Sequence, residues 1–411
     1  FLLYIGILLI IYKKIHKKYK INRNVYIAAL LPFLYLLVAS TAESAFLHTM
    51  SVAMFFAISI ILNTESTTNI KKNYKNIILI DFPKKENWEF KQVLEKETNL
   101  EWNEVETVSN QRRKNVFSTI CRYFKYFTLP LSIFIDRKKY EKIIAWQQFY
   151  GLLYAFYCRI LHSKKYNKLI IMTFIYKAKK GLIGKIYYKF MKFIVQSKYI
   201  DVFICFSKKE CKDYAKIFNV KEEKFQFCTL GLESIEIDKD KIKQRDYILS
   251  CGRSNRDYEF LYNALKDTDY KLKILSDECK LKNEKNIEIY NNIFNDEYYK
   301  MLEESYIVVI PLMDENISSG QLAILQAMQL GKPIICTKSS TVTDYIKNRI
   351  NGFIVKKEKN ELLEKIQELY NNKELYTEIS KNEKEFFKEN FSIDSLGKQI
   401  SKIIIDKEKK F

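Results

Sequence analysis

Two short polar stretches carry residue types that suit an anionic ligand. The first, Gly252-Arg253-Ser254-Asn255-Arg256, follows the apolar run 247–251. The second, Ser318-Ser319-Gly320-Gln321, comes after the apolar run 306–310 and a polar loop. A guanidinium fork matches phosphate oxygens, and free backbone N–H groups at the start of a helix bind the same anion. We therefore predict that the N–H groups of Ser319, Gly320 and Gln321 form a phosphate site.

The second stretch is positioned by a strand before it and a helix after it. Leu322, Leu325 and Met328 recur at helical spacing, and the pattern stops at Gly331. Ser318 or Ser319 is expected to cap this helix. A strand, a polar loop and a helix in this order place the N–H groups at the carboxyl edge of a parallel sheet.

Composition narrows the function classes. The chain has 411 residues and a formal net charge of +20, which points to an anionic partner. Its three histidines lie far apart, and its eight cysteines form no Cys-x-x-Cys pair. We expect buried free thiols and no metal site.

The first 62 residues have a membrane pattern. Apolar runs cover 1–12, 25–40 and 45–62, and a lysine-rich loop separates the first from the second. By the positive-inside rule the basic loop is cytoplasmic. We predict that residues 1–66 are membrane helices, a fragment of one span plus a hairpin, and that the catalytic domains face the cytoplasm at the cell membrane. A soluble helical hairpin is the alternative.

The rest of the chain alternates short apolar runs with helical segments, which predicts an α/β fold with mainly parallel sheets. The expected strands are 76–81, 142–145, 169–173, 202–206, 225–229, 247–251, 272–276, 287–290, 306–310, 334–336 and 353–355. A charged segment at 233–245 is the expected linker. The predicted domains are 72–235 and 246–390, and a carboxyl-terminal helix at 391–411 is expected to pack back toward the first.

Two stretches, 112–140 and 177–198, mix basic with aromatic residues. Both suit an anionic membrane surface, with the rings at headgroup depth. Packed helices with solvated lysines are the other interpretation. Nucleic acid is not an expected partner, because the sequence has no supporting motif.

The order of the motifs resembles a known family. Gly252-Arg253, the segment 317–335, Thr343-Asp344-Tyr345-Ile346 and Asn351-Gly352-Phe353-Ile354-Val355 succeed one another as in the carboxyl-terminal domain of GT-B glycosyltransferases. The likeness is greatest to glycosyltransferase family 4, or glycosyl transferases group 1. It covers about Asn76 to the end and implies two Rossmann-like domains with an interdomain cleft. It also implies a nucleotide-sugar substrate, UDP- or GDP-linked, with no separate cofactor.

The resemblance assigns roles to particular residues. Gly252 and Arg253 would contact the donor diphosphate, and Arg256 is the nearest cation to the family's lysine. The family's two glutamates fall on Ser318 and Gln326. Gln326 is expected to be half sheltered and bonded, either to ribose hydroxyls or to nearby backbone. The predicted donor-binding set is Gly252, Arg253, Arg256, Ser318, Ser319, Gly320, Gln321 and Gln326, with Arg253, Arg256 and Ser318 as catalytic residues.

An acceptor site is expected in the first half. Trp146, Gln147 and Tyr150 follow the predicted strand 142–145 and offer an aromatic platform and an amide, although core packing of Trp146 fits equally. Tyr176 and Lys177 occupy the region of the family's frequent active-site histidine.

The sequence therefore predicts a membrane-associated glycosyltransferase that is retaining and metal-independent. Its acceptor would be a polyprenyl-linked lipid or a polysaccharide. One alternative is a nucleotide-sugar-binding scaffold that is weakly active or inactive. The other is a fusion, because the first 62 residues look similar to the last spans of a polysaccharide-polymerase-like membrane protein.

Overall fold

The computed structural model describes residues 74–84, 86–106, 116–235 and 245–408. The predicted membrane helices at 1–66 lie outside these residues. Within the ranges that are described, no helix is both long and apolar enough to cross a bilayer.

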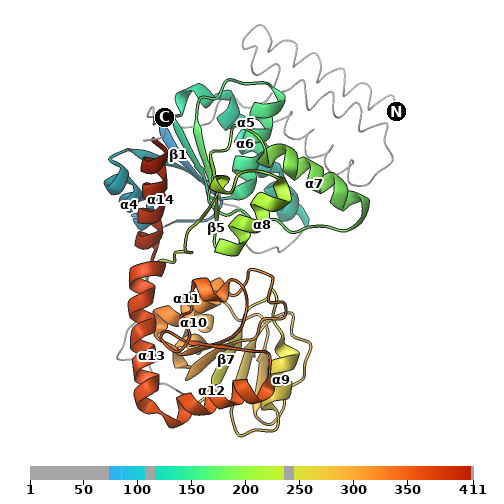
Figure 1. Cartoon of the computed structure of the whole chain (residues 1–411), viewed down its shortest axis with the longest axis vertical. Helices are drawn as coiled ribbons and strands as arrows, with labels where there is room; N and C mark the ends of the chain where they lie inside the picture. Colours follow the sequence, from blue (N-terminus) through green and yellow to red (C-terminus); the bar gives the residue numbers. More distant parts are fainter. Residues whose placement is uncertain (1–73, 85, 107–115, 236–244, 409–411) are drawn as a thin grey trace. The chain divides into compact units, whose positions relative to one another are not determined.

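The contacts divide the chain into two units. One unit holds the first six-stranded sheet, and the other holds the second sheet together with Asn87–Asn99 and Phe206–Asp213. Figure 1 shows both sheets with helices packed on them.

The first sheet has the strand order β2-β1-β3-β4-β5-β6, and every pair with a described register is parallel. Its strands are β1 (Asn76–Ile80), β2 (Trp102–Glu106), β3 (Lys142–Ala145), β4 (Lys168–Ile171), β5 (Val202–Cys205) and β6 (Phe225–Phe227). The helices along this part of the chain are α4 (Glu89–Thr98), α5 (Val116–Ile135), α6 (Gln148–Ile160), α7 (Gly181–Val195) and α8 (Lys208–Phe218), with short 3-10 turns at Arg137–Lys139 and Glu222–Lys224. Helix α6 packs on β3 and β4, and α5 and α7 pack on α6. The apolar strands β1 and β5 are buried along their whole length, as a covered parallel sheet requires.

The second sheet has the order β12-β11-β10-β7-β8-β9 and is also parallel. Its strands are β7 (Ile248–Cys251), β8 (Leu272–Leu275), β9 (Ile287–Tyr290), β10 (Ile307–Ile310), β11 (Ile334–Thr337) and β12 (Phe353–Val355). The helices are α9 (Tyr258–Leu265), α10 (Asn295–Glu304), α11 (Gln321–Leu330), α12 (Lys359–Asn371), α13 (Lys373–Phe386) and α14 (Ile393–Glu408), with a 3-10 turn at Val342–Asp344 and a π-helical turn at Phe387–Phe391.

Alternate residues of the second sheet face two separate cores. Val308 and Ile310 of β10 pack with α11, whereas Ile307 and Val309 pack with α9 and α12. Side chains of a strand point alternately to its two faces, so a continuous apolar run fills both cores. The unit is therefore a three-layer α/β/α structure, which fixes the loops at the carboxyl edge of the sheet.

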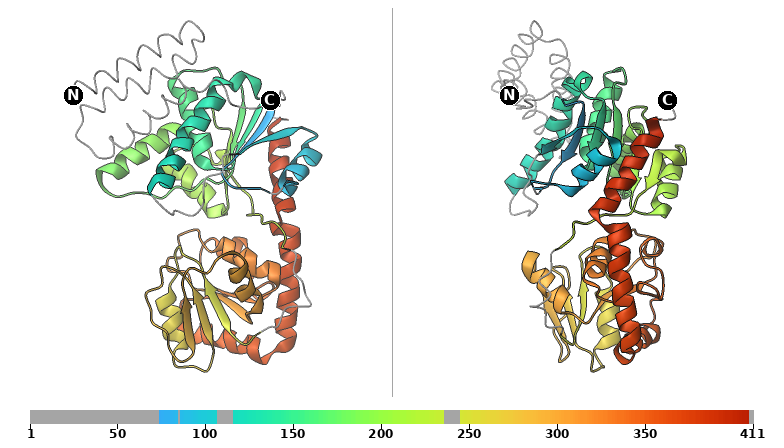
Figure 2. Two further views of the ribbon diagram at one scale, coloured as in Figure 1. Left: turned by 180° about the vertical axis from the view of Figure 1, so that it is seen from behind. Right: turned by 90° about the vertical axis from the view of Figure 1, so that its left-hand side faces the viewer.

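The carboxyl-terminal helix α14 lies alongside α4 in both views of Figure 2. Gly397 sits at the contact, since a Cβ added there would lie 2.8 Å from Cγ1 of Val93. The missing side chain lets the two helices approach closely.

Candidate functional site

The strand order of the second unit places its candidate site. The chain runs from β7 outward to β8 and β9, then crosses back to add β10 on the other side of β7. In open α/β sheets, ligands bind outside the carboxyl ends of the strands where the order reverses. The loops that begin at Gly252 and at Pro311 meet at this point. They carry the predicted donor-binding residues from Gly252 to Gln321.

Asn255 joins these two loops. Its Nδ2 donates to the carbonyl of Asp314 and to Oγ of Ser319, both at 2.9 Å, and its Oδ1 accepts from the N–H of Asp314 at 2.9 Å. The residue has φ of 57°, a conformation that asparagine tolerates better than most side chains. Sequence reasoning missed this role. The available signal was an asparagine three residues after a glycine at the end of a buried strand.

Arg256 braces the first loop. Its Nε donates to the carbonyl of Cys251 at 3.0 Å and its Nη1 to the carbonyl of Ser254 at 2.8 Å. Gly252 lies beneath the guanidinium with φ of 118°. The structure thus gives Arg256 a loop-holding role, and its contact with a diphosphate stays a prediction.

Arg253 is the more exposed cation of the pair. Its side chain is 58% exposed, its Nη2 lies 3.1 Å from Oδ2 of Asp277, and its guanidinium lies over the ring of Phe294. An exposed pair of this kind contributes little to stability, so the guanidinium can exchange its partner for a ligand at small cost.

Helix α11 begins without a side-chain cap, and the expected cap from Ser318 or Ser319 is wrong. Gly320 is the N-cap residue, with φ of 93°. The hydroxyl of Ser319 instead accepts the bond from Asn255, and Oγ of Ser318 accepts from Nε2 of Gln321 at 2.6 Å. Among the described residues, no side chain caps the first turn of α11, which follows β10 at the switch point, so its N–H groups suit an anion.

Gln326 is held by two neighbouring tyrosines of α10. The hydroxyl of Tyr298 donates to Oε1 at 2.8 Å, and Nε2 donates to the hydroxyl of Tyr299 at 3.0 Å. Burial raises the pKa of Tyr298 well above its ordinary value, so this hydroxyl stays a donor. The expectation that Gln326 is partly buried and bonded is confirmed, but these partners are side chains and not backbone. Its contact with a ribose stays a prediction.

The predicted acceptor residues of the first unit lie after β3. Trp146 is partly exposed and meets the ring of Phe82 edge to face at 5.5 Å. Gln147 caps α6 through a bond from the N–H of Phe149, and its Nε2 donates to Asp81 at 2.9 Å. Tyr150 has 0% exposure, so its ring belongs to the core and does not offer a surface to an acceptor.

Tyr176 and Lys177 follow β4 on an irregular segment. The Tyr176 ring stacks on Tyr187 at 5.5 Å, and its N–H donates to the hydroxyl of Tyr214 at 3.2 Å. Lys177 is exposed. Neither carries a contact that marks it as a replacement for a histidine, and both remain predicted acceptor residues.

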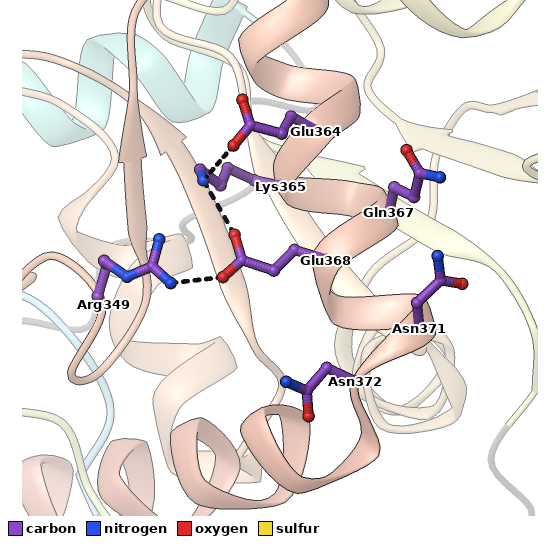
Figure 3. Close-up of a pocket in the computed structure, with 7 residues that line it drawn as sticks. All are labelled: Arg349, Glu364, Lys365, Gln367, Glu368, Asn371 and Asn372. Atoms are coloured by element: carbon purple, nitrogen blue, oxygen red, sulfur yellow. Dashed lines mark hydrogen bonds and ion pairs between the residues drawn. The ribbon is translucent and has the colours of Figure 1, made fainter.

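A polar groove lies apart from these residues, on α12 and the loop before β12 (Figure 3). Arg349, Glu364, Lys365 and Glu368 form a chain of ion pairs along it. Arg349 precedes β12, so the groove lies at the amino end of that strand, whereas the donor-binding candidates follow the carboxyl ends of β7 and β10.

In the described part of the chain, no three His, Cys, Asp or Glu side chains gather where they could hold an ion.

Comparison with known proteins finds a family match over part of the chain and solved structures with a similar fold. Residues 265–386 match the family Glycosyl transferases group 1. An uncharacterized glycosyltransferase of Methanocaldococcus jannaschii is 30% identical over 140 residues, which are 32% of this chain and 39% of that relative. The chain therefore matches only about two fifths of the relative's length.

Two solved structures have similar folds. One is the crystal structure of HepE of Anabaena in complex with UDP-glucose, which matches with a TM-score of 0.58 at 12% identity. This match covers 81% of this chain and 100% of the HepE chain. The other is sucrose-phosphate synthase of Thermosynechococcus elongatus, which matches with a TM-score of 0.58 at 13% identity. This match covers 82% of this chain and 100% of the synthase chain. The resemblance drawn from the sequence is confirmed: the chain has the α/β fold of GT-B proteins, and its second unit matches glycosyl transferases group 1.

Proposed function

We propose that this chain is a glycosyltransferase that transfers a sugar from a nucleotide-sugar donor to a lipid-linked or polysaccharide acceptor. The observation that carries the proposal is the switch point of the second unit. There, Gly252 and Arg253 follow β7, and the uncapped start of α11 follows β10. A cation and free N–H groups at one sheet edge suit a diphosphate.

In the proposed reaction the diphosphate is the leaving group. Charge develops on it as the sugar–oxygen bond breaks, and donors already in place stabilise that charge. Arg253 and the first-turn N–H groups of α11 supply the donors, and Arg256 keeps the loop in position. A retaining transfer by same-face attack lets the departing phosphate take the acceptor's proton, so these residues suffice without a protein base.

The match to group 1 glycosyltransferases and the likeness to HepE, which was solved with UDP-glucose, favour a UDP-linked donor as the first to test. A GDP-linked donor is second. Because the identity to that structure is 12%, the binding experiment below decides between the two nucleotides.

We further propose that the reaction takes place at the cytoplasmic face of the cell membrane. Helix α7 supports this, because Leu182, Ile183 and Ile186 are 73%, 57% and 55% exposed beside Lys185 and Lys189. Exposed aliphatic side chains among lysines suit an anionic lipid surface and are unusual on a face that meets only water. The sequence pattern of residues 1–66 is the second support.

Two linked measurements test the proposed activity. The full chain in detergent is screened by thermal unfolding against UDP, GDP and their sugars, since a ligand of the native state raises the melting temperature. Nucleoside diphosphate release is then measured with polyprenyl-linked and oligosaccharide acceptors. We expect a shift with one nucleotide class and release with one acceptor class. Neither shift nor release across the panel would refute the proposal.

A nucleotide-sugar-binding scaffold is the second candidate. It is favoured by Ser318 and Gln326, which stand where the family has glutamates, and by the two tyrosines that already engage the Gln326 amide. Thermal stabilisation by a nucleotide sugar, with no release across all acceptors, would select this candidate over the enzyme.

A further inference from the structure

One lysine ties together three loops at the carboxyl edge of the second sheet. Lys357 is the second residue after β12, and β11 separates β12 from β10 and β7 in the strand order. Its Nζ donates to the carbonyl of Met313, in the loop after β10, at 3.1 Å. The same Nζ lies 2.5 Å from Oδ2 of Asp257, at the end of the loop after β7. The long stem of this lysine therefore carries a charge from the edge of the sheet to its switch point.

The carboxylate of Asp257 is bonded through both of its oxygens. Its Oδ1 accepts from the N–H of Phe260 at 2.9 Å and caps α9, while its Oδ2 faces Lys357. The N–H of Asp257 donates to the carbonyl of Pro311 at 2.8 Å. The Asp257 side chain is only 16% exposed, so its pair with Lys357 is screened less than an ion pair at the surface. This pair fixes the start of α9 against the loop after β10.

Two separate attachments thus hold the loops after β7 and β10 together. Asn255 supplies the first, through its bonds to the loop after β10. Lys357 supplies the second, through its contacts with both loops. Loops that are joined at one point can still turn about it, whereas a second attachment removes that freedom. Because these loops carry Arg253 and the residues that lead into α11, the second attachment sets the spacing between the guanidinium and the first-turn N–H groups.

We propose that Lys357 is a positioning residue of the donor site, which holds the two loops at the spacing that a diphosphate requires. The inference rests on the proposed function and adds to it a residue that was not among those predicted from the sequence. Donors stabilise developing charge when they are already in place, so the residues that lock them determine how well they bind. Lys357 acts through Met313 and Asp257, toward which two of the three N–H groups of its ammonium are directed.

The test begins with Lys357→Met, which removes the ammonium and keeps a long apolar side chain. UDP and GDP are titrated into the full chain in detergent by calorimetry. We expect the nucleotide that binds wild type to bind this variant about 10-fold or more weakly, as for loss of a hydrogen bond to a charged group. Lys357→Arg should recover most of the lost affinity, because a guanidinium can also donate to a carbonyl and a carboxylate together.

Lys356→Met is the matched control. Lys356 is the preceding residue, is exposed and carries the same charge. Its substitution should leave nucleotide affinity unchanged, because Lys357 acts through its contacts and not through net charge. Urea unfolding gives the free energy of unfolding of each variant, which should change little, since the Lys357 side chain is 39% exposed. A merely structural role would instead lower this free energy and leave the affinity of the folded protein as in wild type.

Asp257→Asn separates positioning from direct contact with the ligand. Asparagine still caps a helix well, but it offers no charge to Lys357. If Lys357 acts through Asp257, this variant also loses affinity, and the double variant with Lys357→Met loses less than the sum of the two single losses in binding free energy. If the ammonium contacted the diphosphate itself, removal of the competing carboxylate would leave the affinity unchanged or raise it. That result would show the positioning role to be wrong.

The remaining failures are distinguishable. If wild type binds neither nucleotide, the proposed function fails and the role of Lys357 fails with it. If wild type binds a nucleotide and Lys357→Met binds it as tightly, only the role of Lys357 is overturned. An equal loss of affinity in Lys356→Met would likewise overturn it, since net charge would then explain both losses.

Discussion

The guanidinium of Arg256 lies directly against the Cα of Gly252. A Cβ added to Gly252 would be 2.5 Å from Nη2 and 2.8 Å from Cζ of Arg256. Gly252 also has φ of 118°, a backbone conformation that other residues rarely adopt. Size and conformation therefore both require glycine where the loop turns toward the proposed diphosphate.

We predict that Gly252→Ala lowers the free energy of unfolding by about 1–3 kcal/mol, the usual range for enforced backbone strain. It should also abolish the nucleotide-induced thermal shift, because Arg256 must leave the carbonyls of Cys251 and Ser254. Gly181→Ala is the control. Gly181 has φ of 71° but no atom within 4 Å of the added Cβ, so it reproduces the strain without the clash. An unchanged nucleotide shift in Gly252→Ala would contradict this account.

Arg253→Ala should weaken nucleoside diphosphate binding about 10-fold or more, since it removes a charged donor to phosphate. Stability should change little, because the pair with Asp277 is exposed. Arg349→Ala is a close control: Arg349 is 54% exposed and paired with Glu368, but it lies in the groove of Figure 3. Titration of both variants with UDP by calorimetry checks this, and equal losses in the two would refute a specific role for Arg253.

Tyr298→Phe should destabilise the second unit by about 1–3 kcal/mol. The substitution removes the donor to Oε1 of Gln326 in a partly buried place, where an unsatisfied acceptor is costly. Tyr262→Phe is the comparison, because the Tyr262 hydroxyl bonds Glu284 at the surface. Urea unfolding gives the free energy of unfolding of each variant. Tyr262→Phe should change it little, so the difference between the two variants should be close to the full effect of Tyr298→Phe.

Glu383 should make stability depend on pH. It has 0% exposure, its Oε1 accepts from the N–H of Ile334 at 3.0 Å, and burial raises its pKa well above the ordinary value of 4.5. Above pH 4.5 the unfolded chain loses this proton while the folded chain keeps it. The contribution to stability is therefore full below pH 4.5 and is lost as pH rises toward the folded pKa.

Glu383→Gln keeps a neutral acceptor and removes this titration. We predict that wild type loses stability relative to the variant as pH rises from 5 to 8, by up to about 1.4 kcal/mol per pH unit. Urea unfolding at each pH gives the difference, with Glu385→Gln at an exposed position of α13 as control. Parallel curves for wild type and Glu383→Gln would show that the carboxyl is ionised when folded.

Helix α7 should be shielded by anionic lipid. In nanodiscs that contain phosphatidylglycerol, we expect slower amide exchange over Gly181–Val195 than in neutral nanodiscs, measured by mass spectrometry. Leu182→Glu with Ile186→Glu should remove the difference. Ile350→Glu, at a residue 47% exposed in the second unit, should not. Equal exchange in the two lipids would show that α7 does not meet the membrane.

The secondary structure was predicted well from the local pattern of apolar residues. The apolar runs predicted as strands at 142–145, 287–290 and 353–355 coincide with β3, β9 and β12. Strand β2 was missed because its sequence, Trp-Asn-Glu-Val-Glu, is mostly polar. It lies at the edge of the sheet, where only one side pairs and only Trp102 is buried.

The contacts of the candidate site residues were predicted less well from the sequence. Ser319 stands where a helix cap is expected, yet its hydroxyl accepts a hydrogen bond from Asn255, which is 64 residues away in the sequence. Gln147 was predicted to contact an acceptor, yet in the structure its amide donates to Asp81, which is 66 residues away in the sequence. Tyr150 also follows the end of β3, but its place on α6 turns it into the core.

The sequence by itself determined the α/β class, the strands of both sheets except β2, and the two polar loops that resemble group 1 glycosyltransferases. These features follow from the period of apolar residues and from glycine, arginine and serine at strand ends, which act over a few neighbours. Only the tertiary structure decided that Arg256 braces Gly252, that Gln326 lies between two tyrosines, and that Asp81 meets Gln147. Such contacts depend on strand order, which brings distant loops to one edge of a sheet and which no local pattern encodes.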